Sequence, residues 1–472
     1  MGPGAEDHTD PAQMGAVSLA WAIAGKRVSA VEAVSACFAR RDQVDGVINA
    51  IPVGFEEAAL IRAQEADAAL RNDEVWGPLH GIPVVIKGNV DIAGQANTQG
   101  LKILSGNVAS ENSPVVDNLL RAGAIPIGYS NIPELSIRWH TECEAYGTTK
   151  NPWNPALTPG GSSGGAGAAL ITGQCSLAHG NDYGGSLRFP AQCAGVVTIR
   201  PTIGRIPQFN VTAPGVVGMT AQLMAVQGPM ARRVEDVRIA LHAMAVTDAR
   251  DPSCVPGPME RLEHKRPLKI AVPDLGREDD VDEQVANGVL KAAGILEQHG
   301  CAVEIVKLPD IPTAHDLYCK LVVNEMRHDL AHLIQPFLQG PARQAFDNLL
   351  HNVPVVAPAE MMGLLASRAK LMREWSQFFG TWDLILGPVS TRTPFAVGDD
   401  AAGTEQHMEI LRSLRYVTPG NLLGLPSVVL PVGLEQGLPQ AVQLTARWYC
   451  EETCLSAAEL IEQAVPGLRR CE

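Results

Sequence analysis

The sequence has no cluster of basic residues and no long apolar run, and both absences limit what the protein can bind. Acidic residues outnumber basic ones by 51 to 37, which gives a formal net charge of -14 at pH 7. Nucleic acid and anionic membrane surfaces are therefore poor partners. No segment supplies the about 18 uninterrupted apolar residues that a transmembrane helix requires. We expect neither a nucleic-acid partner nor a membrane partner.

Patterned cysteines are also missing. The 10 cysteines show no regular spacing in a chain of 472 residues, which favours free thiols in a reducing compartment over a disulfide framework. The nearest pair, Cys450 and Cys454, has no second Cys or His pair at the spacing of a zinc site. The acidic N-terminus, Met1 to Asp7, lacks the basic start of a signal peptide. We therefore predict a cytoplasmic protein without a bound metal.

Segments typical of strands alternate with segments typical of helices in the first third of the chain. Ser29 and Glu32 form a capping-box pattern that opens a helix. The segments that follow are a helix over 56–70, a strand over 82–86, a helix over 115–122 and a strand over 124–128. This alternation predicts an α/β fold, in which helices cover the faces of a sheet. Ligands of such sheets gather beyond the carboxyl ends of the strands, where Lys87 lies.

Two loops rich in glycine and serine lie close together, at Gly160–Gly165 and Gly180–Ser186. The first opens a helix from Ala166, and the second follows a strand expected over 175–178. A serine hydroxyl is a weak nucleophile near pH 7 and needs a neighbouring base. Consecutive glycines let backbone N–H groups converge on the oxyanion that forms during acyl transfer. With Lys87 as the base, these loops predict a serine hydrolase that acts on amides without metal or histidine.

Longer motifs in the same order resemble those of the amidase signature enzymes, and the similarity covers most of the chain. The motifs lie at 81–87, 151–165, 184–188, 200–205 and 228–232. The resemblance implies a large mixed twisted β-sheet covered by helices on both faces. It also implies a Ser–cis-Ser–Lys triad with Ser186 as nucleophile and Lys87 as base. Ser162 would relay the proton between them, held by a cis peptide bond to the preceding glycine.

The resemblance assigns supporting roles to residues around this triad. The backbone N–H groups that would stabilise the oxyanion, beside that of Ser186 itself, belong to Tyr183, Gly184 and Gly185. Residues that would support the relay and the turn are Ser163, Asp182 and Arg188, with Arg188 in a structural ion pair rather than in contact with substrate. Residues that would line the substrate pocket are Ile137, Trp139 and Tyr183. Because aromatic residues make up only 5% of the chain, a few Trp and Tyr side chains can dominate the shape of that pocket.

Burial is the physical condition for the proposed base. A lysine accepts a proton only when its resting form is neutral, and a pocket of low polarity lowers the lysine pKa by penalising the ammonium ion. Lys87 ends an apolar run, which suits that environment. The expected reaction is hydrolysis of a small aryl or aliphatic amide to an acid and an amine or ammonia. Esterase side activity, no cofactor, a small-molecule amide as partner and a homodimer complete the expectation.

We interpret residues 1–472 as one domain with three parts. The catalytic core is expected at about 75–235, a variable substrate-shaping region at about 250–410, and C-terminal strands and a helix at 411–472. The segment Thr247–Pro267 is rich in Pro, Arg and Glu and fits either a linker or a surface excursion.

Two positions depart from the pattern of the family. Gly88 follows the lysine where aspartate is common, and the turn reads Asn181-Asp182-Tyr183 where Ser-Asp-Thr is common. Tyr183 therefore places a bulky phenol where a small hydroxyl is usual. The backbone donors of the turn survive both changes.

Three other functions remain open from the sequence. A glutaminase subunit of a transfer-RNA amidotransferase would use the same triad, but it usually has Gln where Phe189 stands. A catalytically silent protein could keep the fold without the reaction. His328 and His332 stand at the i, i+4 spacing of a zinc pair, yet Asp329 replaces the required Glu and no third ligand is evident.

Overall fold

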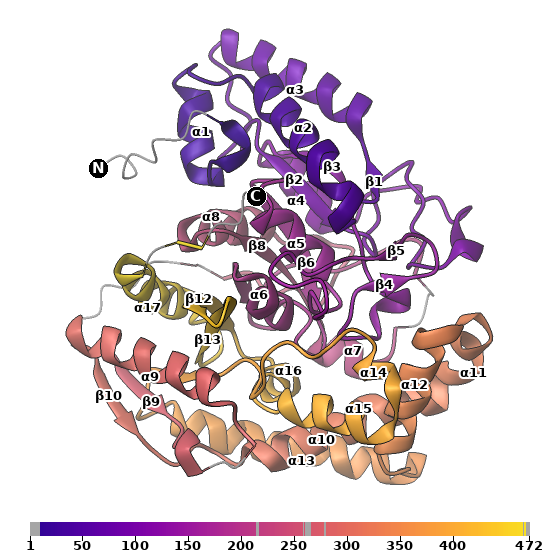
Figure 1. Ribbon diagram of the computed structural model, residues 1–472, viewed down its shortest axis with the longest axis vertical. Coiled ribbons are helices and arrows are strands. Elements are labelled where there is room, and N and C mark those ends of the chain that lie inside the picture. The colour runs from indigo at the N-terminus through magenta and orange to yellow at the C-terminus, as the bar shows by residue number, and fades with distance from the viewer. Residues whose placement is uncertain are drawn as a thin grey trace.

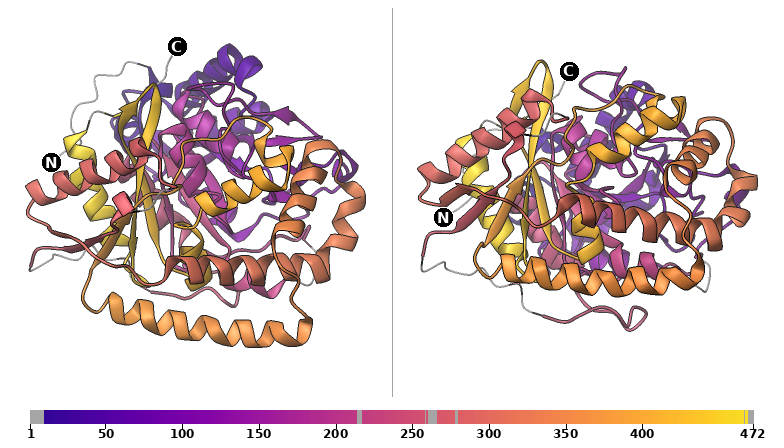
Figure 2. Two further views of the ribbon diagram at one scale, coloured as in Figure 1. Left: turned by 60° about the horizontal axis from the view of Figure 1, so that its bottom comes forward. Right: turned by 90° about the horizontal axis from the view of Figure 1, so that it is seen from below.

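The computed structural model describes residues 10–213, 217–257, 259, 266–277, 280–465 and 467–468. A mixed sheet of 11 strands runs through the molecule, and helices cover both of its faces (Figures 1 and 2). The predicted fold class is confirmed.

The order of strands in the sheet joins distant parts of the chain. In spatial order the strands are β1 (Val53–Gly54), β3 (Ile125–Ser130), β2 (Pro83–Lys87), β6 (Leu177–Asp182), β8 (Val226–Ala231), β7 (Val197–Arg200), β12 (Ser427–Glu435), β13 (Leu438–Ala446), β11 (Leu384–Gly387), β9 (Lys269–Val272) and β10 (Ala302–Ile305). Strand β2 runs parallel to β3 and β6, and β9 runs parallel to β10 and β11. The other pairs in this sheet are antiparallel. A separate two-stranded sheet pairs β4 (Glu142–Cys143) with β5 (Gly147–Thr148).

The helices fall into two layers and an end group. The α-helices are α1 (Ala16–Ala24), α2 (Ala30–Ile48), α3 (Glu56–Arg71), α4 (Pro114–Arg121), α5 (Gly164–Ile171), α6 (Arg188–Ala194), α7 (Met219–Met224), α8 (Val234–Met244), α9 (Glu283–Gln298), α10 (Ile311–Glu325), α11 (Ala331–Ile334), α12 (Gly340–Asn352), α13 (Pro358–Phe378), α14 (Asp399–Ala402), α15 (Thr404–Ser413), α16 (Thr418–Leu423) and α17 (Glu451–Ala464). Helices α10 to α15 gather at one end of the molecule, at the bottom of Figure 1.

Alternation along the central strands divides the core into two layers. In β2, Val84 and Ile86 belong to one buried cluster, whereas Val85 belongs to the other. Helices α4, α8, α9 and α17 contribute to the first cluster, and α3, α5 and α6 contribute to the second. Because successive side chains of a strand point to opposite faces, a strand covered on both faces is apolar throughout. This explains why the run before Lys87 contains no polar residue.

Most predicted elements are confirmed, and one strand differs from the expectation. Helix α2 begins with Ser29 as its N-cap, in a complete capping box with Glu32. The strand expected over 175–178 is instead β6, which extends to Asp182. The reason is tertiary, since β6 pairs with β8 as far as Asp182 opposite Val226. The first part of the second glycine loop is therefore strand.

His328 and His332 lie where a zinc pair was considered. His328 is in a π-helical turn, Met326–Leu330, and His332 is in α11. The His328 ring bonds the carbonyl of Val356 (2.8 Å). Within the described ranges, no group of three or more His, Cys, Asp and Glu side chains is placed to hold a metal ion.

Cysteines and membrane spans were also considered from the sequence. The nine cysteines that the structure describes are free thiols, and Cys471 lies outside the described residues. The N-terminal segment Met1 to Asp7 and part of Thr247–Pro267 also lie outside them. Among the helices described, none combines the length and apolar character that crossing a membrane requires.

One buried ion pair joins the variable region to the N-terminal third of the chain. Arg138 Nε lies 2.8 Å from Asp400 Oδ2, and both side chains are almost fully buried. Replacing Asp400 with alanine leaves this guanidinium with only Glu142 as an acidic partner. We expect Asp400→Ala to lower the free energy of unfolding by about 3 kcal/mol, because an undercompensated buried charge is costly.

The matched control is Asp347→Ala, which removes a half-exposed helix pair with Arg343. This control should cost less than about 1 kcal/mol. Urea denaturation measures both variants. Equal losses, or separate transitions for the two parts of the chain, would contradict the interpretation of residues 1–472 as one domain.

Candidate active site

The site forms where three parallel strands end. Lys87 is the last residue of β2, and β2 runs parallel to both β3 and β6. Asp182 is the last residue of β6, and its side chain is fully buried. The carboxyl ends of neighbouring parallel strands meet at the same edge of a sheet. Strand pairing therefore brings Lys87 next to the second glycine loop.

The Lys87 amine is fully buried and faces two polar groups. Its Nζ lies 2.8 Å from Ser162 Oγ and 2.6 Å from Asn181 Oδ1. Burial lowers the Lys87 pKa from 10.5 to about 7, although the Asp182 carboxylate partly opposes this shift. A large share of the lysine is therefore neutral near pH 7.

The first glycine loop positions Ser162 and Ser163. The peptide bond between Gly161 and Ser162 is cis, as the resemblance implied. A side chain at Gly161 would come within 2.5 Å of the Arg138 carbonyl oxygen, so only glycine fits there. The Ser163 N–H donates to the Ser186 carbonyl oxygen (3.3 Å). The two glycine loops are thus joined, and Ser186 lies next to the Ser162–Lys87 pair.

Ser186 lies in the turn after β6. Its side chain is 8% exposed, and its hydroxyl has no hydrogen-bond partner among the residues described. The N–H groups of Tyr183, Gly184 and Ser186 likewise have no acceptor in the described part of the chain. Gly185 differs from the expectation, because its N–H already donates to Asp182 Oδ1 (2.8 Å). Three backbone donors, rather than four, are therefore open to an oxyanion.

Asp182 and Arg188 hold this turn, and the expected structural ion pair is present. Arg188 Nε lies 3.0 Å from Asp182 Oδ2, and both side chains are fully buried. Burial alone would raise the Asp182 pKa, but the charge and hydrogen bonds of Arg188 hold that pKa well below its usual range. The carboxylate also accepts the N–H groups of Gly185 and Leu187. Asp182 therefore fixes the backbone around Ser186.

Residues from the C-terminal third support the same turn, and no pattern in the sequence pointed to them. Arg188 donates to the Val417 carbonyl oxygen (2.8 Å), Gln443 Oε1 (3.0 Å) and Asn421 Oδ1 (2.6 Å). Asn421 Nδ2 in turn donates to Asp182 Oδ1 (2.8 Å). These contacts link residues more than 200 positions apart in the sequence.

Helix α10 adds one more contact to the turn. The Tyr318 hydroxyl donates to the Tyr183 carbonyl oxygen (2.9 Å). Because α10 belongs to the variable region, this bond ties that region to the backbone beside the nucleophile.

Two of the three predicted pocket residues contact the turn directly. Trp139 Nε1 donates to the Gly184 carbonyl oxygen (2.9 Å). The Tyr183 hydroxyl bonds Thr220 Oγ1, which in turn bonds Glu325. Ile137 instead packs against a small apolar cluster that includes Phe346. The variable region therefore meets the site through the segment that carries Ile137 and Trp139.

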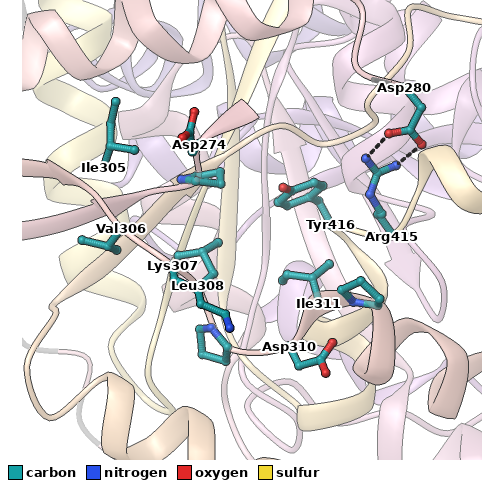
Figure 3. Close-up of a pocket in the computed structure, with 13 residues that line it drawn as sticks. Asp274, Asp280, Ile305, Val306, Lys307, Leu308, Asp310, Ile311, Arg415 and Tyr416 are labelled. Carbon is teal, nitrogen blue, oxygen red and sulfur yellow. Dashed lines mark hydrogen bonds and ion pairs between the residues drawn. The ribbon is translucent and has the colours of Figure 1, made fainter. Parts of the chain in front are cut away.

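A separate cavity of about 940 Å³ opens at the carboxyl ends of β9 and β10 (Figure 3). The ion pair between Arg415 and Asp280 (2.7 Å) lies in its wall. None of the predicted site residues lines this cavity. It borders Tyr416, which precedes the Val417 carbonyl that accepts from Arg188.

Asn181 and Asn89 are polar residues of the site to which the sequence assigned no role. Asn181 contacts Lys87 and also donates from Nδ2 to Asn89 Oδ1 (2.9 Å). The departure of the turn from Ser-Asp-Thr was the only sequence signal at Asn181. Asn89 follows the lysine by two positions and carried no signal.

Comparisons with known proteins agree with this geometry. The family model for amidase matches residues 32–455. An indoleacetamide hydrolase from Bradyrhizobium diazoefficiens is 40% identical over 451 residues, which cover 95% of this chain and 86% of that protein. The catalytic-type subunit of a glutamyl-tRNA(Gln) amidotransferase from Picosynechococcus is 32% identical and covers 93% of this chain and 95% of its own length.

Among solved structures, a 6-aminohexanoate cyclic dimer hydrolase matches with a TM-score of 0.82 at 26% identity. The alignment covers 98% of this chain and 99% of that one. The resemblance found in the motifs is confirmed over nearly the whole chain: the protein belongs to the amidase family.

Proposed function

We propose that this amidase cleaves the C–N bond of a small carboxylic amide through an acyl-enzyme on Ser186. One observation carries the proposal. A buried lysine with a pKa of about 7 lies 2.8 Å from Ser162 Oγ, beside a turn whose free N–H groups flank Ser186. Such an arrangement provides a base, a relay and an oxyanion site without a metal or a histidine.

The first half of the reaction forms the acyl-enzyme. Ser186 Oγ attacks the amide carbonyl carbon while its proton passes to Ser162 Oγ, and the Ser162 proton passes to the neutral Lys87 amine. The oxyanion that forms accepts hydrogen bonds from free backbone N–H groups of the turn. Losing one such donor typically raises the barrier by about 3–4 kcal/mol. The C–N bond then breaks as the relay returns a proton to the leaving nitrogen.

The second half releases the acid. Water attacks the ester carbonyl of the acylated Ser186 and gives its proton through Ser162 to Lys87. The tetrahedral intermediate collapses, Ser186 Oγ regains a proton, and the carboxylic acid leaves. Because the same relay can protonate an oxygen leaving group, esters should also be hydrolysed.

The substrate proposed is a primary amide with an aryl or short aliphatic acyl group. The 40% identical relative is an indoleacetamide hydrolase, and Trp139 and Tyr183 provide aromatic surface next to the turn. Ile137 would form part of the wall on the side of the variable region. We propose that the core at about 75–235 carries the chemistry and that the region at about 250–410 shapes the pocket.

A role in a transfer-RNA amidotransferase is less well supported. The relative of that kind is less similar, at 32% identity. Phe189, which stands where those proteins usually have Gln, is buried and stacks on Phe395 with ring centroids 5.9 Å apart. Position 189 therefore serves packing in this chain.

Removing the nucleophile gives the first test. Ser186→Ala should lower kcat/KM for an arylacetamide by about 10⁴-fold or more, because the acyl-enzyme can no longer form. The panel should include an aliphatic amide, glutamine and an aryl ester, and the enzyme should favour the arylacetamide over glutamine. Ser367→Ala, which removes an exposed helix hydroxyl, should leave the activity unchanged. Amidase activity that survives in Ser186→Ala would exclude the proposal.

The pH dependence tests the base. The folded pKa of Lys87 is lowered from 10.5 to about 7, so the amine is neutral above that value and protonated below it. We expect kcat/KM to be level above about pH 8 and to fall about tenfold per pH unit well below pH 7. Initial rates between about pH 5 and pH 9 measure this limb. A flat profile over the same interval would mean that Lys87 is not the base.

A further inference from the structure

We propose that Asn181 is a positioning residue that binds the N–H groups of the neutral Lys87 amine and thereby directs its lone pair at Ser162. The inference rests on the proposed function and extends it to a residue outside the triad. Asn181 offers Lys87 two acceptors, with Oδ1 at 2.6 Å and the backbone oxygen at 3.5 Å from Nζ. Ser162 Oγ is the third polar atom within hydrogen-bond distance.

The number of hydrogens on the amine gives this geometry its meaning. A neutral amine has two N–H groups and one lone pair, whereas the ammonium form has three N–H donors and no lone pair. When Asn181 accepts both N–H groups, the lone pair can point only toward Ser162. The Ser162 hydroxyl can then donate its proton along that line. Without these acceptors, the amine could rotate and donate an N–H group to Ser162 instead.

A short chain of amides fixes the orientation of the Asn181 side chain. Asn181 Nδ2 donates to Asn89 Oδ1 (2.9 Å), and Asn89 Nδ2 donates to Ser136 Oγ (3.0 Å). A reversed Asn181 amide would set two donors, Nδ2 and Lys87 Nζ, against each other. The backbone oxygen of Asn89 also accepts from Asn210 Nδ2 (2.9 Å). The oxygen of the Asn181 amide is thereby held on the lysine side.

A neutral partner at this position matters because charge controls the base. The groups in electrostatic contact with Lys87 are Asp182 and His179, both on β6. The Asp182 charge is already paired with Arg188, and burial lowers the His179 pKa to about 3, so that ring is neutral. Asn181 can thus accept hydrogen bonds from Lys87 without adding a negative charge that would favour the ammonium form.

The decisive variant is Asn181→Asp, which keeps the shape of the side chain and adds one negative charge. A carboxylate in contact with an amine commonly raises its pKa by about one unit or more. The acidic limb of the kcat/KM profile should therefore move upward by about one pH unit or more. Activity at pH 7 should fall about tenfold and recover at higher pH. Asn181→Ala should instead lower the plateau without an upward movement of the limb.

Two further variants grade the effect. Asn89→Asp places the charge one residue farther from Lys87 and should move the limb less than Asn181→Asp does. Asn72→Asp adds the same charge on an exposed position at the end of α3, and its profile should match that of the unmodified enzyme. Circular dichroism and thermal melting should accompany each profile. If Asn181→Asp does not fold, the contrast between Asn89→Asp and Asn72→Asp decides.

The result distinguishes this inference from the proposed function. An unmoved limb in Asn181→Asp, or equal limbs in Asn89→Asp and Asn72→Asp, would overturn the role of Asn181 while hydrolysis still depended on Ser186. Loss of the Ser186 dependence itself would instead remove the function on which the inference rests. An upward limb with recovered activity at high pH supports the inference.

Discussion

The burial of one lysine at the end of a central strand is the constraint on which the site depends. Strand β2 is covered on both faces, and its apolar residues exclude water from the Lys87 amine. Burial lowers the Lys87 pKa to about 7, so the desolvation of the amine during folding makes it a base that works near neutral pH. The same burial requires polar partners for the amine, and Ser162 and Asn181 meet that need.

A second buried charge holds the reacting serine in place. Asp182 binds the turn on one side and Arg188 on the other, and Arg188 in turn binds backbone and side-chain oxygens of the C-terminal third. The strands that carry the chemistry and the strands near the C-terminus thus form one continuous sheet with one shared network. Substitutions far from Ser186 in sequence, at Asn421 for example, act on the geometry of its turn.

Local sequence predicted those parts of the structure that depend on local physics. The capping box of α2, the buried strand before Lys87 and the glycine turns follow from side-chain chemistry within a few residues. The length of β6, the contact between Lys87 and Asn181 and the bond from Tyr318 to Tyr183 do not. These features depend on the pairing of β6 with β2 and β8 and on the packing of α10, which bring together residues far apart along the chain. The occupied N–H of Gly185 was missed because the orientation of Asp182 depends on Arg188.

The most direct measurement of the central claim is the site and rate of covalent labelling by a fluorophosphonate, mapped by mass spectrometry. The reagent requires an activated serine, so the adduct reports the nucleophile without knowledge of the substrate. A neutral Lys87 that activates Ser186 through Ser162 leads to a single adduct on Ser186, and to labelling slowed by orders of magnitude in Lys87→Met. An adduct on another residue, or equal labelling of Ser186 in both proteins, would contradict it.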